Sequence, residues 1–155
     1  MVRCRPEADS SSTKVSDSFA TEPPYSEDTY WSPICRLRSE LRCWVRMVWK
    51  DDASVQESHW GMLLTLPVKG YLEGPDGPIP VRHVERVEMS TNRVKGGMAG
   101  KPLQMIDIKE EMLEGLSETP AIWTLSDGSW SLERIFQDEP VQLVRIANPF
   151  RSMKA

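Results

Sequence analysis

Apolar and polar residues alternate with a period of two along much of the chain, which is typical of β-strands with one buried face. From Cys43 to Lys50 the alternation places Val45, Met47 and Trp49 on one side. Gly61–Leu66 is a continuous apolar run, which predicts a central strand buried on both faces. Further extended runs are Tyr71–Glu73, Val81–Met89 and Val141–Ala147.

The stretch from His59 to Met89 is predicted to hold the centre of a sheet. Within it, Gly74–Pro80 contains three prolines and two glycines, which indicates a turn without regular hydrogen bonding. On the run Val81–Met89, alternation puts His83 and Glu85 on one face among apolar side chains. This pair is the most chemically suggestive arrangement in the chain.

Two segments show helical spacing instead. The first is predicted to start with Ser32 as a cap and Pro33 at the first helical position. The second starts with the capping-box pattern Asp107-Ile-Lys-Glu110 and ends before Thr119-Pro120. The apolar stripes are Ile34, Leu37, Leu41 and Trp44 in the first helix, and Ile108, Met112 and Leu116 in the second.

A hairpin is predicted around Asp127-Gly128, because this dipeptide tolerates the positive φ angles of a type I′ turn. Its strands are expected at Ala121–Leu125 and Trp130–Phe136, with Leu125 opposite Trp130. The run Val141–Ala147 is then the last strand of the sheet.

These elements predict an α+β fold: a single antiparallel or mixed sheet of about five to seven short strands with two short helices. Residues 28–148 are expected to form a single globular domain. Residues 1–27 are rich in Ser, Thr, Pro and acidic residues without an apolar period, so they predict a disordered tail. Residues 149–155 are expected to form a frayed C-terminus.

Charge and composition narrow the function classes. The chain of 155 residues has a formal charge of −4, which argues against general nucleic-acid binding. No apolar run approaches the roughly 20 residues of a membrane span, and no signal peptide is recognisable, so a cytoplasmic location is expected. Cys4, Cys35 and Cys43 form no C-x-x-C pair, so reduced thiols are expected and a zinc site is not.

His83 and Glu85 are the weak candidates for catalysis, as a general base and its orienting carboxylate. They are also candidate metal ligands, with His59 or Asp107 as a third. The simpler interpretation, which we favour, is a structural histidine on a strand. No cofactor is expected.

Pro75-Asp76 followed by Asp107-Ile-Lys109 resembles the pattern of metal-dependent nucleases, whose carboxylates and lysine converge on a cation. Here Asp76 is predicted in a turn and Asp107 at a helix cap, which favours a chance match. The Gly-rich, basic segment Ser90–Lys101 lacks the spacing of a phosphate-binding loop and predicts a flexible surface loop.

The remaining functional signal is an asymmetry of charge. From Asp28 to Lys50 five basic residues stand against two acidic ones, whereas from Leu103 to Pro140 nine acidic residues stand against two basic ones. A concentrated acidic surface attracts basic proteins, so we predict a small protein-binding module, in the manner of an immunity or antagonist protein. The alternatives are a metal-dependent hydrolase or nuclease-like enzyme that uses His83, Glu85 and Asp107, and a domain whose charges only keep it soluble. The predicted binding residues are Glu110, Glu111, Glu114, Glu118, Asp127 and Trp130.

Overall fold

A five-stranded sheet forms the middle of the molecule, with its strands in the order β3-β2-β6-β10-β9 and every neighbouring pair antiparallel. The computed structural model describes residues 25–52, 54–132 and 136–151. The strands are β2 (Val45–Lys50), β3 (Val55–Glu57), β6 (Val84–Ser90), β9 (Trp123–Leu132) and β10 (Phe136–Ala147).

Four further strands form two separate hairpins, β4 (Tyr71–Gly74) with β5 (Gly77–Pro80), and β7 (Asn92–Gly96) with β8 (Leu103–Asp107). The helices are α1 (Glu27–Leu41) and α2 (Lys109–Leu116), and a 3-10 turn, η2 (Val81–His83), precedes β6. The α+β class and the two helices are therefore confirmed. The prediction of one sheet is wrong, because four of the strands pair only within their own hairpins.

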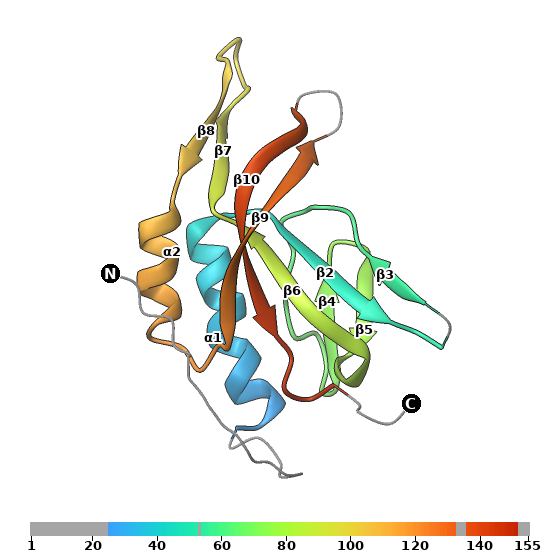
Figure 1. The fold of residues 1–155 in the computed structure, drawn as a ribbon. Helices are drawn as coiled ribbons and strands as arrows, with labels where there is room; N and C mark the ends of the chain where they lie inside the picture. The colour runs from blue at the N-terminus through green and yellow to red at the C-terminus, as the bar shows by residue number, and fades with distance from the viewer. Residues whose placement is uncertain (1–24, 53, 133–135, 152–155) are drawn as a thin grey trace.

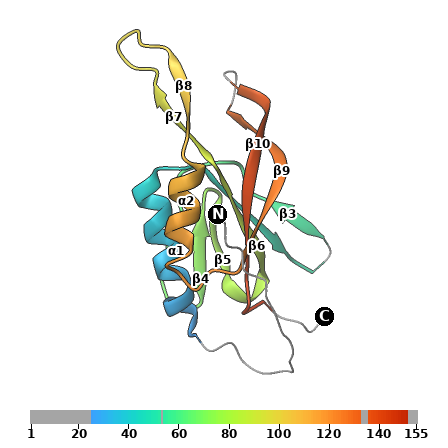
Figure 2. The same ribbon diagram turned by 60° about the vertical axis from the view of Figure 1, so that its left-hand side comes forward.

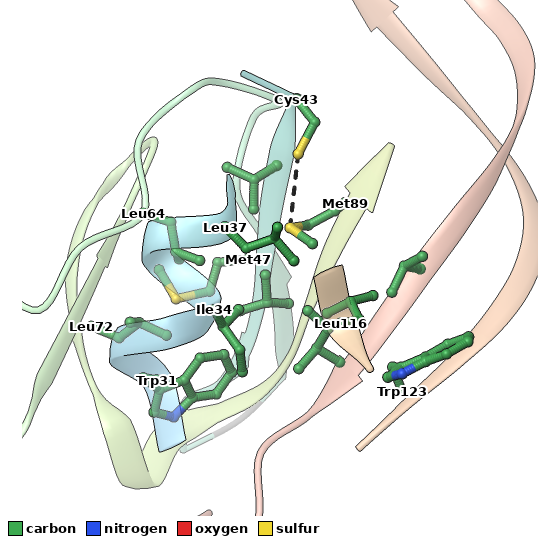
Figure 3. Close-up of a cluster of buried hydrophobic side chains, with 14 of the residues drawn as sticks. Trp31, Ile34, Leu37, Cys43, Met47, Leu64, Leu72, Met89, Leu116 and Trp123 are labelled. Atoms are coloured by element: carbon green, nitrogen blue, oxygen red, sulfur yellow. Dashed lines mark hydrogen bonds between the residues drawn. The ribbon is translucent and has the colours of Figure 1, made fainter. Parts of the chain in front are cut away.

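Both helices pack on one face of the sheet, together with the β4–β5 hairpin, while the β7–β8 hairpin extends away from this body (Figures 1 and 2). The core lies between these layers (Figure 3). In it, Ile34 of α1 and Leu116 of α2 belong to the same buried cluster as Met47 and Met89 of the sheet. The thiol of Cys43 lies 3.9 Å from the Met89 sulfur.

Helix α1 starts earlier than predicted, because Ser26 is its N-cap and accepts a hydrogen bond of 3.1 Å from the Thr29 amide. The predicted start at Ser32 is wrong, and Pro33 lies inside the helix. An interior proline costs about 3 kcal/mol. Tyr30 and Trp31 lie in the added turn and are fully buried. Two buried aromatic side chains contribute more than this cost, at about 25 cal/mol per Å² of buried apolar area.

The predicted central strand Gly61–Leu66 is also wrong. This segment makes only two isolated bridges, Val45 with Gly61 and Thr65 with Glu73, and Met62 and Leu63 are exposed. Only Leu64 of its long apolar side chains is buried in the core. The segment instead connects the sheet to the β4–β5 hairpin.

The proline-rich segment Gly74–Pro80 is more regular than predicted. Gly77–Pro80 forms β5, which pairs with β4 so that Pro78 faces Glu73 and Pro80 faces Tyr71. The Val81 amide donates to the Gly70 carbonyl, so the hydrogen-bonded pairs are those that alternate with the prolines. A proline at a non-hydrogen-bonded position removes no ladder bond, and the hairpin therefore forms.

The Asp127-Gly128 turn does not form. Strand β9 continues through both residues, and Asp127 pairs with Gln142 and Gly128 with Val141 of β10. The chain instead reverses between Leu132 and Phe136, and residues 133–135 lie outside the described part. Gly128 packs closely against β10, since a Cβ atom there would lie 2.6 Å from Leu143 Cδ1 and would require that side chain to shift.

Two other predictions are partly right. Helix α2 forms, but its N-cap is Ile108, while Asp107 Oδ1 accepts from the Lys109 amide at 2.9 Å. The predicted flexible loop Ser90–Lys101 instead contains β7 and the tip of the β7–β8 hairpin, where positive φ angles occur.

The predicted N-terminal tail, residues 1–27, lies outside the described residues up to residue 24, as does the C-terminal segment from residue 152. In the described ranges, neither helix is long and apolar enough to cross a bilayer.

Candidate functional site

His83 and Glu85 do not share a strand face. His83 is the last residue of η2. Glu85 is an extra residue in β6, because the neighbouring β2 residues Val48 and Trp49 face Arg86 and Val84. The alternation of side chains requires an unbroken strand, and this bulge interrupts it. The Glu85 carboxylate instead forms an ion pair with Arg151.

The other candidate metal ligands lie in separate places. His59 Nδ1 is 3.1 Å from Asp76, whose Oδ2 also accepts from the His59 amide. This pair joins the segment after β3 to the turn between β4 and β5. Asp107 lies at the end of β8 and holds the start of α2. Within residues 25–52, 54–132 and 136–151, no three His, Cys, Asp or Glu side chains are placed to hold a metal ion.

The predicted acidic residues of the second helix do form an exposed surface, here called the acidic surface. Its members are Glu110, Glu111 and Glu114 of α2 and Glu118 in the turn after it, and all four are exposed. Met112 and Leu116, on the opposite side of α2, are buried in the core. The ion pairs found in the described part of the chain involve none of the four glutamates.

The two predicted binding residues outside α2 lie in β9. Asp127 is exposed and shares the helix-covered side of the sheet with Trp123 and Leu125, since alternate residues point to the same side. The backbone of Trp130 pairs with Glu139, and its side chain is outside the described part of the structure.

The most organised polar arrangement lies on the other face of the sheet. The Glu88 cluster consists of Glu88 and three arginines, Arg46, Arg86 and Arg145. Arg46 on β2 and Arg145 on β10 both face Glu88 on β6, and Arg86 is two residues earlier on β6. The four side chains therefore point to one side, away from the helices.

The Glu88 carboxylate is completely buried among these arginines. Its Oε1 accepts from Arg46 Nη2 at 2.6 Å and from Arg46 Nε at 3.1 Å. Its Oε2 accepts from Arg86 Nε at 2.7 Å, and Arg145 Nε lies 3.2 Å from the same oxygen. Burial alone would raise the pKa of Glu88, but the hydrogen bonds and charges of Arg46 and Arg86 lower it below its ordinary value. Glu88 is therefore ionised at neutral pH.

The three arginines differ in the contacts that they make beyond Glu88. Arg46 also forms an ion pair of 3.3 Å with Glu57, and its guanidinium lies 4.8 Å from the centre of the Trp60 ring. The terminal Nη atoms of Arg86 and Arg145 have no hydrogen-bond partner among the described residues. Their side chains are 33% and 41% exposed.

No member of the Glu88 cluster is among the predicted site residues, although the sequence contains a signal for it. Three strands each carry one charged residue between two apolar ones. These are Val45-Arg46-Met47, Val87-Glu88-Met89 and Val144-Arg145-Ile146. A charge in the middle of an apolar strand needs a partner, and here the three strands supply one another.

Comparison with known proteins identifies no relative: no family model, no curated protein and no solved structure matches the chain.

Proposed function

We propose that the chain is a protein-binding module that engages a basic partner protein through the acidic surface. The observation that carries this proposal is the set of four exposed glutamates on and just after α2, none of which has a basic partner in the described residues. Unpaired carboxylates grouped in this way create a negative potential that steers a basic surface into contact.

The support beneath the acidic surface favours the same function. Met112 and Leu116 fix α2 to the core, and Gly115 allows close approach to α1, since a Cβ atom there would meet Leu37 Cδ1 at 2.5 Å. A rigid helix loses little entropy when a partner binds its outer face. Such a module fits an immunity or antagonist role, in which a small acidic protein covers a basic active site.

No observation favours the alternative of a metal-dependent hydrolase. His83 and Glu85 are separated by the start of β6 and its bulge, and Asp107 lies at the end of a different hairpin. We therefore propose no catalytic role for these residues.

The test compares two double variants with equal changes in charge. Glu114→Lys with Glu118→Lys alters the acidic surface at the C-terminal end of α2, where positive charge also suits the helix dipole. Glu40→Lys with Asp52→Lys alters exposed acids elsewhere. The partner is first captured from the native cell with the unaltered chain and identified by mass spectrometry, and its affinity is then measured with purified proteins.

We expect the first variant to bind the partner at least tenfold more weakly, corresponding to about 1.4 kcal/mol. The control variant should bind within about twofold of the unaltered chain, because surface charges away from an interface act only weakly. Circular dichroism should show that both variants remain folded. Capture of no partner, or equal affinity for the two variants, would contradict the proposal.

A further inference from the structure

We propose that Arg86 and Arg145 form a binding site for a phosphate group on the sheet face opposite the helices. This inference does not depend on the acidic surface, which belongs to the other side of the sheet. The site is built from two neighbouring strands, since Arg86 belongs to β6 and Arg145 to β10.

The two guanidinium groups are held close together by one atom. Arg86 Nε is 2.7 Å and Arg145 Nε is 3.2 Å from Glu88 Oε2, so the two nitrogens are at most about 6 Å apart. Glu88 Oε2 occupies the space between these two nitrogens, so an added anion would accept from the Nη atoms on the outer sides of the two guanidinium groups. Glu88 therefore brings two partly exposed guanidinium groups side by side.

Charge favours an anion at the same place. The Glu88 cluster holds three arginines and one carboxylate, and Glu57 offsets part of the excess only at Arg46. Arg46 is further engaged by the Trp60 ring. Arg86 and Arg145 both lie against the second oxygen of Glu88 through their Nε atoms, and their Nη atoms have no acceptor among the described residues. The unmatched positive charge is thus concentrated on these two residues.

The number of free donors favours phosphate over carboxylate. A carboxylate has two oxygens in one plane and pairs with the fork of one guanidinium. A phosphate group has at least three acceptor oxygens arranged tetrahedrally, so it can accept from two guanidinium groups that approach from different directions. Glu88 positions Arg86 by a hydrogen bond and attracts Arg145 by its charge, which lowers the entropy that binding would otherwise cost.

The test measures binding of inorganic phosphate and of phosphoserine by isothermal titration calorimetry, with chloride adjusted to equal ionic strength. Inorganic phosphate represents a free anion, and phosphoserine represents a phosphate group carried on a larger ligand. The variants are Arg86→Gln and Arg145→Gln. The control is Arg82→Gln, which removes an exposed arginine of η2 from outside the cluster.

We expect saturable binding of both ligands by the unaltered chain, and at least tenfold weaker binding by each of the two site variants. Arg82→Gln should bind within twofold of the unaltered chain. Arg145→Lys keeps the charge but loses the fork, and we expect an intermediate affinity. Tighter binding of phosphoserine would identify a phosphorylated ligand, and equal binding a free anion; either supports the site.

Three outcomes would overturn the proposal. They are no saturable binding by the unaltered chain, unchanged affinity in the site variants, and an equal loss in Arg82→Gln, which would indicate general charge attraction. If Arg86→Gln unfolds the protein, Arg145→Gln alone still tests the site. Arg145 lies near Glu88 but makes no hydrogen bond to it, so its loss disturbs the sheet less.

Discussion

Glu88 is buried and charged at the same time, and its surroundings explain how this is tolerated. Transfer of a carboxylate into a protein interior costs several kcal/mol, unless close charges and hydrogen bonds offset the loss of water. Arg46 supplies two hydrogen bonds and Arg86 a third, while Arg145 adds its charge at 3.2 Å. Removal of the carboxylate would leave three arginines crowded together on one sheet face.

We therefore expect Glu88→Gln to lower the free energy of unfolding by about 3–5 kcal/mol, the cost of breaking a buried ion pair from one side. The matched control is Glu57→Gln, since Glu57 also contacts Arg46 but its side chain is 52% exposed. Its effect should stay within about 1 kcal/mol. Urea denaturation followed by tryptophan fluorescence measures both values. Equal effects of the two variants would show that Glu88 is not specially stabilising.

The lowered pKa of Glu88 also predicts how stability depends on pH. A carboxyl group whose pKa is lower in the folded state stabilises the fold fully above its unfolded pKa of about 4.3. This contribution is lost as the pH falls from about that value through the lower pKa of the folded state. The free energy of unfolding should therefore decrease as the pH falls below about 5. The Glu88→Gln variant should lose less stability over the same interval. Parallel pH profiles for the two proteins would contradict this assignment.

At the level of single elements, the start of α1 shows that burial of aromatic side chains can outweigh a local capping sequence. Ser32 and Pro33 have the residue types of a helix start, but the helix begins six residues before Pro33, at Glu27. Tyr30 is fixed in the added turn by its hydroxyl, which donates to the Ala147 carbonyl and accepts from the Ile122 amide. The helix thus extends toward the contacts that bury its aromatic residues.

The two serines give a direct test of this start. Ser26→Ala removes the side chain that accepts from the Thr29 amide, and we expect a loss of about 1 kcal/mol. Ser32→Ala changes an interior helical position, and we expect an effect within about 0.5 kcal/mol. Thermal and urea denaturation measure both. A larger loss for Ser32→Ala would move the cap back to the position predicted from sequence.

Elements with a clear periodicity could be predicted from sequence, whereas elements set by distant partners could not. Helix α2 follows from its apolar stripe, and β2 from its alternation. The prediction of a turn at Asp127-Gly128 is wrong, because pairing with β10 over its length satisfies more backbone hydrogen-bonding groups than a local turn would. The prediction of a strand at Gly61–Leu66 is wrong, because an apolar composition does not determine whether a segment pairs with a neighbouring strand.

The same distinction applies to the candidate sites. Exposure of Glu110, Glu111 and Glu114 could be predicted, since it depends only on the positions of neighbouring residues around one helix. The Glu88 cluster requires β6 to lie between β2 and β10, an order that joins residues 42 and 57 positions apart in the chain. The predicted pairing of His83 with Glu85 is wrong for a different reason, because a single bulged residue changes the face of the strand on which a side chain lies.

On the scale of the whole molecule, the acidic surface and the Glu88 cluster lie on opposite sides of the sheet. The acidic surface belongs to the side of the two helices, whose place Figure 1 shows. The opposite side carries Arg46, Arg86 and Arg145 around a buried carboxylate. The net charge of −4 gives no indication of this arrangement. The two ligands that we propose, which differ in charge, therefore belong to opposite sides of the sheet.

The Glu88 cluster also has a consequence for how the molecule opens. It connects β2, β6 and β10, so separation of any one of these strands exposes the carboxylate or removes one of its partners. Backbone amides in the middle of the three strands should therefore exchange with deuterium through one shared opening, at the same free energy. Amides of β7 and β8 should exchange earlier and independently, since that hairpin extends from the body (Figure 2). In the Glu88→Gln variant, we expect native-state hydrogen exchange to show different free energies of opening for β2, β6 and β10.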